Sequence, residues 1–131
     1  MQDRPHAAAI LAAVAAFLRE AAIPNLPPRE AFDARVAANA LDLVQRQISS
    51  GFTREALEQD RLQTLLGHDG GLADLNTEFA LELREGRLDA SDPSVSEHLW
   101  ATTLDKLAVD QPRYSAYLRT LQERQAASGE N

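Results

Sequence analysis

The stretch REAFDARVAANALDLVQRQIS, residues 29–49, decides the fold. Its apolar side chains recur at helical spacing along two edges. One edge holds Phe32, Val36, Ala40 and Leu43, and the other holds Ala37, Leu41, Val44 and Ile48. At about 100° per residue, these edges cover roughly half of the circumference of a helix. The pattern therefore predicts a long central helix over 29–49, which Ser50-Gly51 is expected to end.

Helices are predicted on both sides of this stretch. Pro24, Pro27 and Pro28 end a helix over 5–22, for which Asp3 is the expected N-cap residue. Later helices are expected over 53–67, with Thr53 as the N-cap, over 72–85, ending at Gly86, and over 93–110, opening at Asp92-Pro93. A last helix is expected after the break Asp110-Gln111-Pro112, with Asp110 as a possible cap.

No segment has the apolar/polar alternation of a strand, and alanine and leucine favour helix. We therefore expect an all-α fold, a compact antiparallel bundle of about six helices with no sheet. The 131 residues are expected to form one domain over 1–131, with a frayed tail from about residue 125.

Composition excludes several classes of protein. The chain has no cysteine, which excludes disulfides, zinc-cysteine sites and thiol chemistry. A formal net charge of −7 argues against nucleic acid and anionic membrane as partners. The apolar stretch Ala7–Leu18 is shorter than the ~20 residues of a membrane-spanning helix. A signal peptide is the alternative, but Arg19 and Glu20 stand where its cleavage site would begin. The expected location is cytoplasmic.

Acidic residues are concentrated in one part of the chain. Between residues 55 and 110 they outnumber basic residues by 13 to 4. Asp74, Glu78, Glu82 and Glu85 fall on one flank of the helix predicted over 72–85. A solvated face is the favoured interpretation, and a cation site or a docking face for a basic partner is the alternative.

Most enzyme signatures are absent: the chain has no glycine-rich phosphate loop, no Gly-x-Ser-x-Gly and no His-Glu-x-x-His. His6, His68 and His98 fall in different elements. His98 is expected to be partly buried or at the surface, rather than a ligand or a base. His68-Asp69 is expected to form a plain turn, with an anion site as the alternative. We expect no catalytic residue, cofactor or metal.

Two polar patches are candidate ligand-binding sites. Arg35 and Asn39, followed by Asp42 and Arg46, border the apolar face of the helix over 29–49. Arg35 offers a bidentate fork to a carboxylate or phosphate, and Asn39 offers a donor and an acceptor. The alternative is structural pairing, with an Asp42–Arg46 bridge one turn apart.

The second patch is Lys106, Asp110, Arg113 and Tyr114. Lys106, the only lysine, lies one turn from Asp110, and Arg113 and Tyr114 open the next helix. The two interpretations are a small polar pocket with a cation, a carboxylate and a phenol, and a corner in which Lys106 bridges to Asp110.

These patches carry a family resemblance. Arg35-Val-Ala-Ala-Asn39-Ala-Leu, Val44-Gln-Arg46 and Lys106-Leu-Ala-Val-Asp110-Gln-Pro112-Arg113-Tyr114 resemble the signature of an uncharacterised bacterial all-helical family, a domain of unknown function. The opening Asp3-Arg4-Pro5 fits as well, although Asp110 stands where asparagine is equally expected. Genes of this family often lie beside an aminoglycoside-phosphotransferase-like kinase and an acyl-CoA dehydrogenase. The resemblance therefore implies a role near acyl-CoA or small-molecule phosphorylation chemistry, and it does not imply catalysis by this chain.

Two functions follow as hypotheses. The first is a non-catalytic accessory or interaction protein that acts with such a kinase or dehydrogenase and forms a homodimer. Its alanine-rich first helix suits close helix–helix contact, and two-fold dimers are the commonest oligomers. The second is a protein, or small enzyme, that binds a phosphate- or carboxylate-bearing molecule of acyl-CoA type at Arg35, Asn39 and Lys106.

Overall fold

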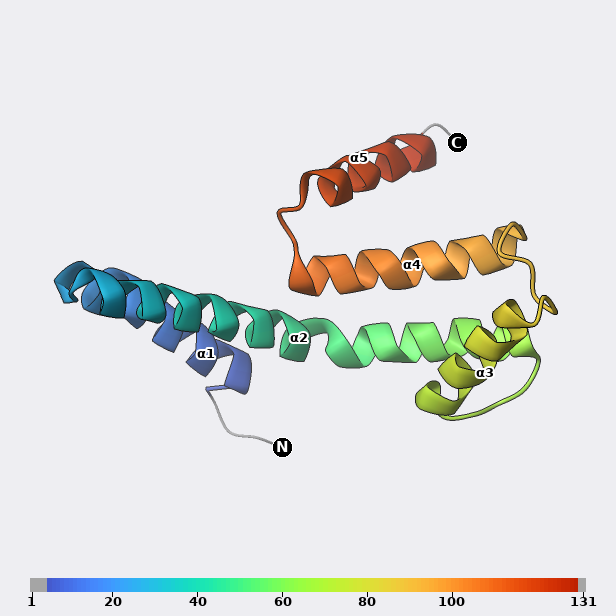
Figure 1. Ribbon diagram of the computed structural model, residues 1–131, viewed down its shortest axis with the longest axis horizontal. Helices are drawn as coiled ribbons and strands as arrows, with labels where there is room; N and C mark the ends of the chain where they lie inside the picture. Colours follow the sequence, from blue (N-terminus) through green and yellow to red (C-terminus); the bar gives the residue numbers. More distant parts are fainter. Residues whose placement is uncertain (1–4, 130–131) are drawn as a thin grey trace. The chain divides into compact units, whose positions relative to one another are not determined.

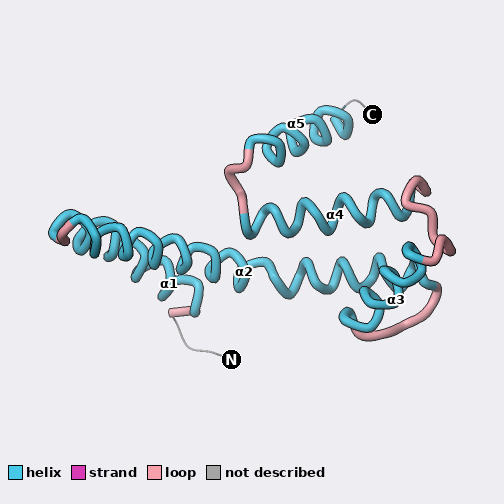
Figure 2. Tube along the Cα trace, in the orientation of Figure 1, coloured by secondary structure: helices cyan, strands magenta, loops and turns pink. Residues whose placement is uncertain are grey.

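The structure is a computed structural model that describes residues 5–129. Helices make up 83% of this part of the chain, and it contains no strand, so the all-α class is confirmed (Figure 2). The elements are α1 (Ala7–Phe17), the π-helical turn η1 (Leu18–Ala22), the 3₁₀ turn η2 (Ile23–Asn25), α2 (Pro28–Leu66), α3 (Leu72–Arg84), α4 (Pro93–Asp110) and α5 (Ser115–Gly129) (Figure 1). The chain divides into two compact units, Met1–Phe52 and Thr53–Asn131, which are described separately below.

The segments 29–49 and 53–67, predicted as two helices, form one helix, α2. The prediction that Ser50-Gly51 ends a helix was therefore wrong, as was Thr53 as an N-cap. Among the described glycines only Gly67 and Gly86 have positive φ, so Gly51 does not take the left-handed conformation that turns a chain out of a helix. A glycine inside a helix costs only about 1 kcal/mol relative to alanine, which the packing of a long helix readily offsets. The described chain consequently has five α-helices rather than about six.

Alanine substitutions at two glycines test the continuity of α2. A Cβ at Gly51 meets no atom within 4 Å, so Gly51→Ala is expected to raise the free energy of unfolding by about 0.5–1 kcal/mol. Gly67, with φ 78°, closes the same helix, so Gly67→Ala is the matched control and is expected to lower stability. Urea unfolding followed by circular dichroism measures both. A destabilising Gly51→Ala would mean that the helix breaks there.

The first unit is a helical hairpin, in which α1 lies along the first part of α2 (Figure 1). The N-cap position of α1 is His6, and Asp3, the cap expected from the sequence, lies outside the described residues. The buried residues of this unit are alanines: Ala15 on α1, and Ala31 and Ala38 on α2. Small side chains let helix backbones approach closely, so the hairpin closes without burying a large side chain.

The second unit has the hydrophobic core. Leu62 of α2, Leu75 and Phe79 of α3 and Val95 of α4 form one buried cluster. Arg54 on α2 donates a hydrogen bond of 2.9 Å to the carbonyl oxygen of Asp105 on α4. Within this unit α4 lies between α2 and α5 (Figure 1).

The predicted C-terminus of α3 and the predicted N-terminus of α4 are confirmed. Gly86, with φ 72°, follows α3, and the N–H of Arg87 donates to the carbonyl of Glu82, which is the pattern of a Schellman motif. The Asp92 carboxylate accepts a 2.8 Å hydrogen bond from the backbone N–H of Ser94 and caps α4.

The last helix begins later than expected. α5 starts at Ser115, so Asp110 is the final residue of α4 and does not cap α5. Gln111 and Tyr114 form a turn between the two helices, closed by a 3.0 Å backbone hydrogen bond. The segment 125–129, predicted as part of a frayed tail, is helical, and residues 130–131 lie outside the described residues.

Candidate functional site

In the first candidate patch, Asn39 and Asp42 both accept hydrogen bonds from Arg19. The Arg19 guanidinium, in η1, donates to the Asp42 carboxylate at 2.6 and 3.2 Å and to Asn39 Oδ1 at 3.1 Å. These bonds join the end of the first helix to α2. Arg19 was not predicted as a site residue from the sequence, although its place next to the proline-marked turn suggested a partner on the following helix. Arg35, the other member of the patch, is exposed.

Single substitutions distinguish the roles of Arg19 and Arg35 in stability. Arg19→Ala is expected to lower the melting temperature of the hairpin, because it leaves Asp42 and Asn39 without this donor. Arg35→Ala is expected to leave the melting temperature unchanged, because surface substitutions away from such contacts change stability little. Thermal unfolding followed by circular dichroism makes the comparison. If Arg35→Ala were the more damaging change, the structural role assigned to Arg19 would be wrong.

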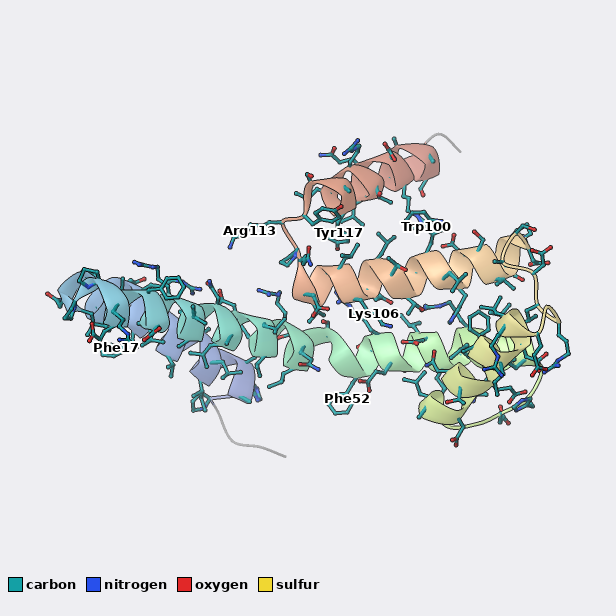
Figure 3. The ribbon with its side chains drawn as sticks, viewed as in Figure 1. Phe17, Phe52, Trp100, Lys106, Arg113 and Tyr117 are labelled. Atoms are coloured by element: carbon teal, nitrogen blue, oxygen red, sulfur yellow. The ribbon has the colours of Figure 1, made fainter. Side chains whose placement is uncertain are left out.

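The second candidate patch lies at the turn between α4 and α5. Lys106, Asp110, Arg113 and Tyr114 are all exposed. Lys106 extends from α4, and Arg113 extends from the loop that follows it (Figure 3). Lys106 follows Asp105, whose carboxylate oxygens lie 3.7 Å from Arg54 Nε and 3.7 Å from Arg61 Nη2. Ligand binding at this patch, and at Arg35 and Asn39, stays a prediction.

Large apolar side chains of the first unit are exposed to solvent. Ile10, Val14 and Phe17 fall on one face of α1 and Phe32, Val36 and Leu43 on one face of α2, and all are exposed. Leu26, Val44, Ile48 and Phe52 are exposed as well, with Phe17 63% and Phe52 87% accessible (Figure 3). We call these ten residues the apolar surface of the hairpin. No residue of the predicted apolar face of 29–49 is therefore buried in this chain alone, and the buried alanines of α2, Ala31 and Ala38, lie outside that face.

The acidic flank of α3 is largely paired. Arg87 forms ion pairs with Glu82, at 2.6 Å, and with Glu85. His68 Nε2 lies 3.0 Å from both oxygens of Glu78. No group of three or more potential metal ligands occurs within residues 5–129. Three of the four acidic side chains of this flank are therefore paired within the chain, and the role of the flank stays a prediction.

His98 lies in the core of the second unit. Its side chain is only 3% exposed and packs edge-on against Phe79, with ring centroids 4.8 Å apart. Its Nδ1 atom has no hydrogen-bond partner among the described residues, and neither do Thr102 Oγ1 on the same helix and Arg61 Nε and Nη2 on α2. Arg61 and His98 both line a hollow of about 250 Å³ between α2 and α4.

His98 was considered from the sequence, but Arg61 was not. The signal was present, since Arg61 directly precedes Leu62 within the apolar pattern of α2, where an arginine is expected to be partly buried. His98 and Arg61 are far apart in the sequence, so only the packing of α4 on α2 brings them together.

The pKa values of the two histidines are expected to shift in opposite directions from the ordinary value. Burial, followed by the Arg61 charge, lowers the pKa of His98 from its ordinary value of 6.5, so stability is expected to fall as the pH drops through and below that value. Hydrogen bonds to Asp69 and Glu78 raise the pKa of His68, so its contribution is present below pH 6.5 and is lost as the pH rises through the raised pKa. Imidazole NMR signals, assigned with His68→Gln and His98→Gln, give the midpoints. A His98 midpoint above that of His68 would contradict the packing.

One segment of the described chain, Ala7–Asn25, is long and apolar enough to cross a membrane by length and composition. It spans 19 residues, more than the uncharged stretch Ala7–Leu18, because it includes Arg19 and Glu20. Signal sequences and helices of soluble proteins pass the same test. The Arg19–Asp42 ion pair ties this segment to α2.

Comparison with known proteins gives one match. The model of a family described as a domain of unknown function, DUF6285, matches residues 24–114, which include both candidate patches and the Arg61–His98 hollow. The opening Asp3-Arg4-Pro5, which the resemblance included, lies outside the match. No curated protein and no solved structure matches the chain. Because the match covers well over half of its length, this chain belongs to the DUF6285 family of uncharacterised proteins.

Proposed function

We propose that this chain is a non-catalytic interaction protein of the bacterial cytoplasm, which pairs with a second copy through its first unit and acts with a partner enzyme. One observation carries the proposal. The hairpin buries only alanines, while ten large apolar side chains stay exposed on it. Soluble monomers rarely expose large apolar patches, and such patches commonly mark protein–protein interfaces.

The distribution of charge favours a second copy as the occupant of the apolar surface. Residues 1–52 contain five acidic and five basic side chains, so this unit has a formal charge of zero. Residues 53–131 carry the whole formal charge of −7. Two copies that met through their acidic units would repel each other, whereas two neutral apolar hairpins meet without that cost.

The class of partner enzyme comes from the resemblance of the two helical motifs. The resemblance implies that genes of this family often lie beside a phosphotransferase-like kinase and an acyl-CoA dehydrogenase, and we take these enzymes as the proposed partners. The acidic second unit, with its net charge of −7, supplies a surface for a basic region of a partner.

Retention of purified enzymes on the immobilised chain tests the partner. One of the two enzymes is expected to be retained in low salt and released as ionic strength rises, because the attraction between exposed charges is screened. The control replaces Glu97 and Glu123 with glutamine, which leaves the apolar surface of the hairpin unchanged. Failure of both enzymes to bind would refute the partner assignment, and salt-independent binding would refute the acidic surface as its site.

The second candidate function is the binding of a phosphate- or carboxylate-bearing small molecule of acyl-CoA type. The accessibility of Lys106, Arg113 and Tyr114 around the α4–α5 turn favours it, since all three are free to meet a ligand from solvent. Titration with coenzyme A, followed by calorimetry, is expected to show binding that Arg113→Ala weakens. Equal binding by Arg113→Ala and wild type would exclude this turn as the site.

A further inference from the structure

No described side chain of α5 belongs to the core of the second unit. None of residues 115–128 is buried, whereas α2, α3 and α4 each supply at least one buried side chain to this unit. The core cluster and the partly buried residues packed against it come from these three helices and from the loop before α4. Because burial of apolar side chains is the main stabilising term of a fold, α5 is held less firmly than its neighbours.

The contacts that α5 makes with α4 are open to solvent. Arg124 Nη2 donates a 2.5 Å hydrogen bond to Glu97 Oε2, and the two side chains are 37% and 62% exposed. Ion pairs with this degree of exposure stabilise a fold little. Trp100 of α4 and Tyr117 of α5 lie on the facing sides of the two helices (Figure 3), yet Trp100 is still 50% exposed. The helix α5 therefore covers α4 loosely.

The segment 111–114, which joins α4 to α5, has the properties of a hinge. It is not helical, and Pro112 within it has no N–H group to donate to a continuing helix. Its 3.0 Å backbone hydrogen bond, from Tyr114 to Gln111, lies within the segment itself. Changes of backbone angle at a few such residues are enough to swing a helix.

The extent of the family match sets α5 apart as well. The match ends at residue 114, so it includes α4 and the hinge segment but not α5. The part of the chain that is common to the family therefore carries the outer face of α4 without the helix that covers it here.

We propose that α5 is a strap that opens and closes over α4 in the folded protein, moving as a unit about the segment 111–114. An isolated helix of its 15 residues is marginal in water, so α5 loses its helical hydrogen bonds when it leaves α4. Opening uncovers the face of α4 that bears Trp100, and tryptophan is enriched at the hot spots of protein interfaces. The closed strap thus withholds a surface of the kind that partners bind. The movement itself does not rest on the proposed function.

Amide hydrogen exchange of the full chain, followed by NMR, tests the strap. Residues 119–126 are expected to show one common protection factor, at least ~100-fold below that of residues 98–104 in α4. Arg124→Ala removes the ion pair with Glu97 and is expected to speed the exchange of all of α5 several-fold, while α4 exchanges as before. Higher ionic strength is expected to do the same in the wild type, because it screens the pair.

Arg119→Ala is the matched control, because Arg119 is exposed on the same helix and forms no ion pair within residues 5–129. It is expected to exchange as the wild type does. Equal protection of α5 and α4 would overturn the strap, since the two helices would then open only when the unit unfolds. Protection that falls steadily from the first turn of α5 to its last would overturn it too, since it indicates fraying of a docked helix. Equal acceleration in the two variants would overturn the assignment of Glu97–Arg124 as the contact that holds the strap closed.

Discussion

Val36→Asp is expected to weaken self-association at least ~100-fold while leaving the monomer folded. Val36 lies within the apolar surface and is 52% exposed in the single chain, so the aspartate stays in water in the monomer. In the dimer it would become a buried, unpaired charge, which costs several kcal/mol. Sedimentation velocity over a concentration series measures the dissociation constant.

Ser49→Asp is the matched control for this change. Ser49 is exposed on the same helix but falls on a different side from Phe32 and Val36 at about 100° per residue. The control adds the same charge and is expected to associate as wild type does. Equal dissociation constants for Val36→Asp and Ser49→Asp would exclude this face of α2 from the dimer.

Leu62→Ala is expected to lower the free energy of unfolding of the second unit by about 3 kcal/mol. Leu62 is completely buried in the cluster with Leu75, Phe79 and Val95, so truncation removes apolar contacts and leaves a cavity. Urea unfolding followed by the fluorescence of Trp100, the only tryptophan, reports on this unit.

Leu57→Ala is the control for the core. Leu57 lies on the same helix but is 54% exposed, so the same truncation is expected to cost less than about 1 kcal/mol. Similar losses from the two substitutions would show that Leu62 is not at the centre of the core.

The sequence predicted those features of the fold that depend on adjacent residues. Asp92-Pro93 starts a helix because an aspartate accepts the first free N–H groups and a proline donates none there. Gly86 ends a helix because its backbone takes positive φ. Ser50-Gly51 resembles the end of a helix in its residue types, yet α2 continues through it. Whether a glycine ends a helix depends also on packing with residues distant in the sequence.

Contacts between residues that are distant in the sequence could not be predicted from local patterns. The edges of 29–49 predicted an amphipathic helix, but not that Ala31 and Ala38 would be buried while Phe32 and Val36 stay exposed. The pattern gives the apolar face of a helix and does not say what covers it. Asn39 was singled out without Arg19, its donor, because the pair forms only after the chain reverses at the prolines.

The mass of the protein in solution tests the central claim, that the apolar surface of the hairpin is a protein–protein interface between two copies. Light scattering on the full chain over a wide range of concentration is the measurement. We expect a mass that rises with concentration to twice the 14.3 kDa of one chain. A mass of 14.3 kDa at every concentration would contradict it.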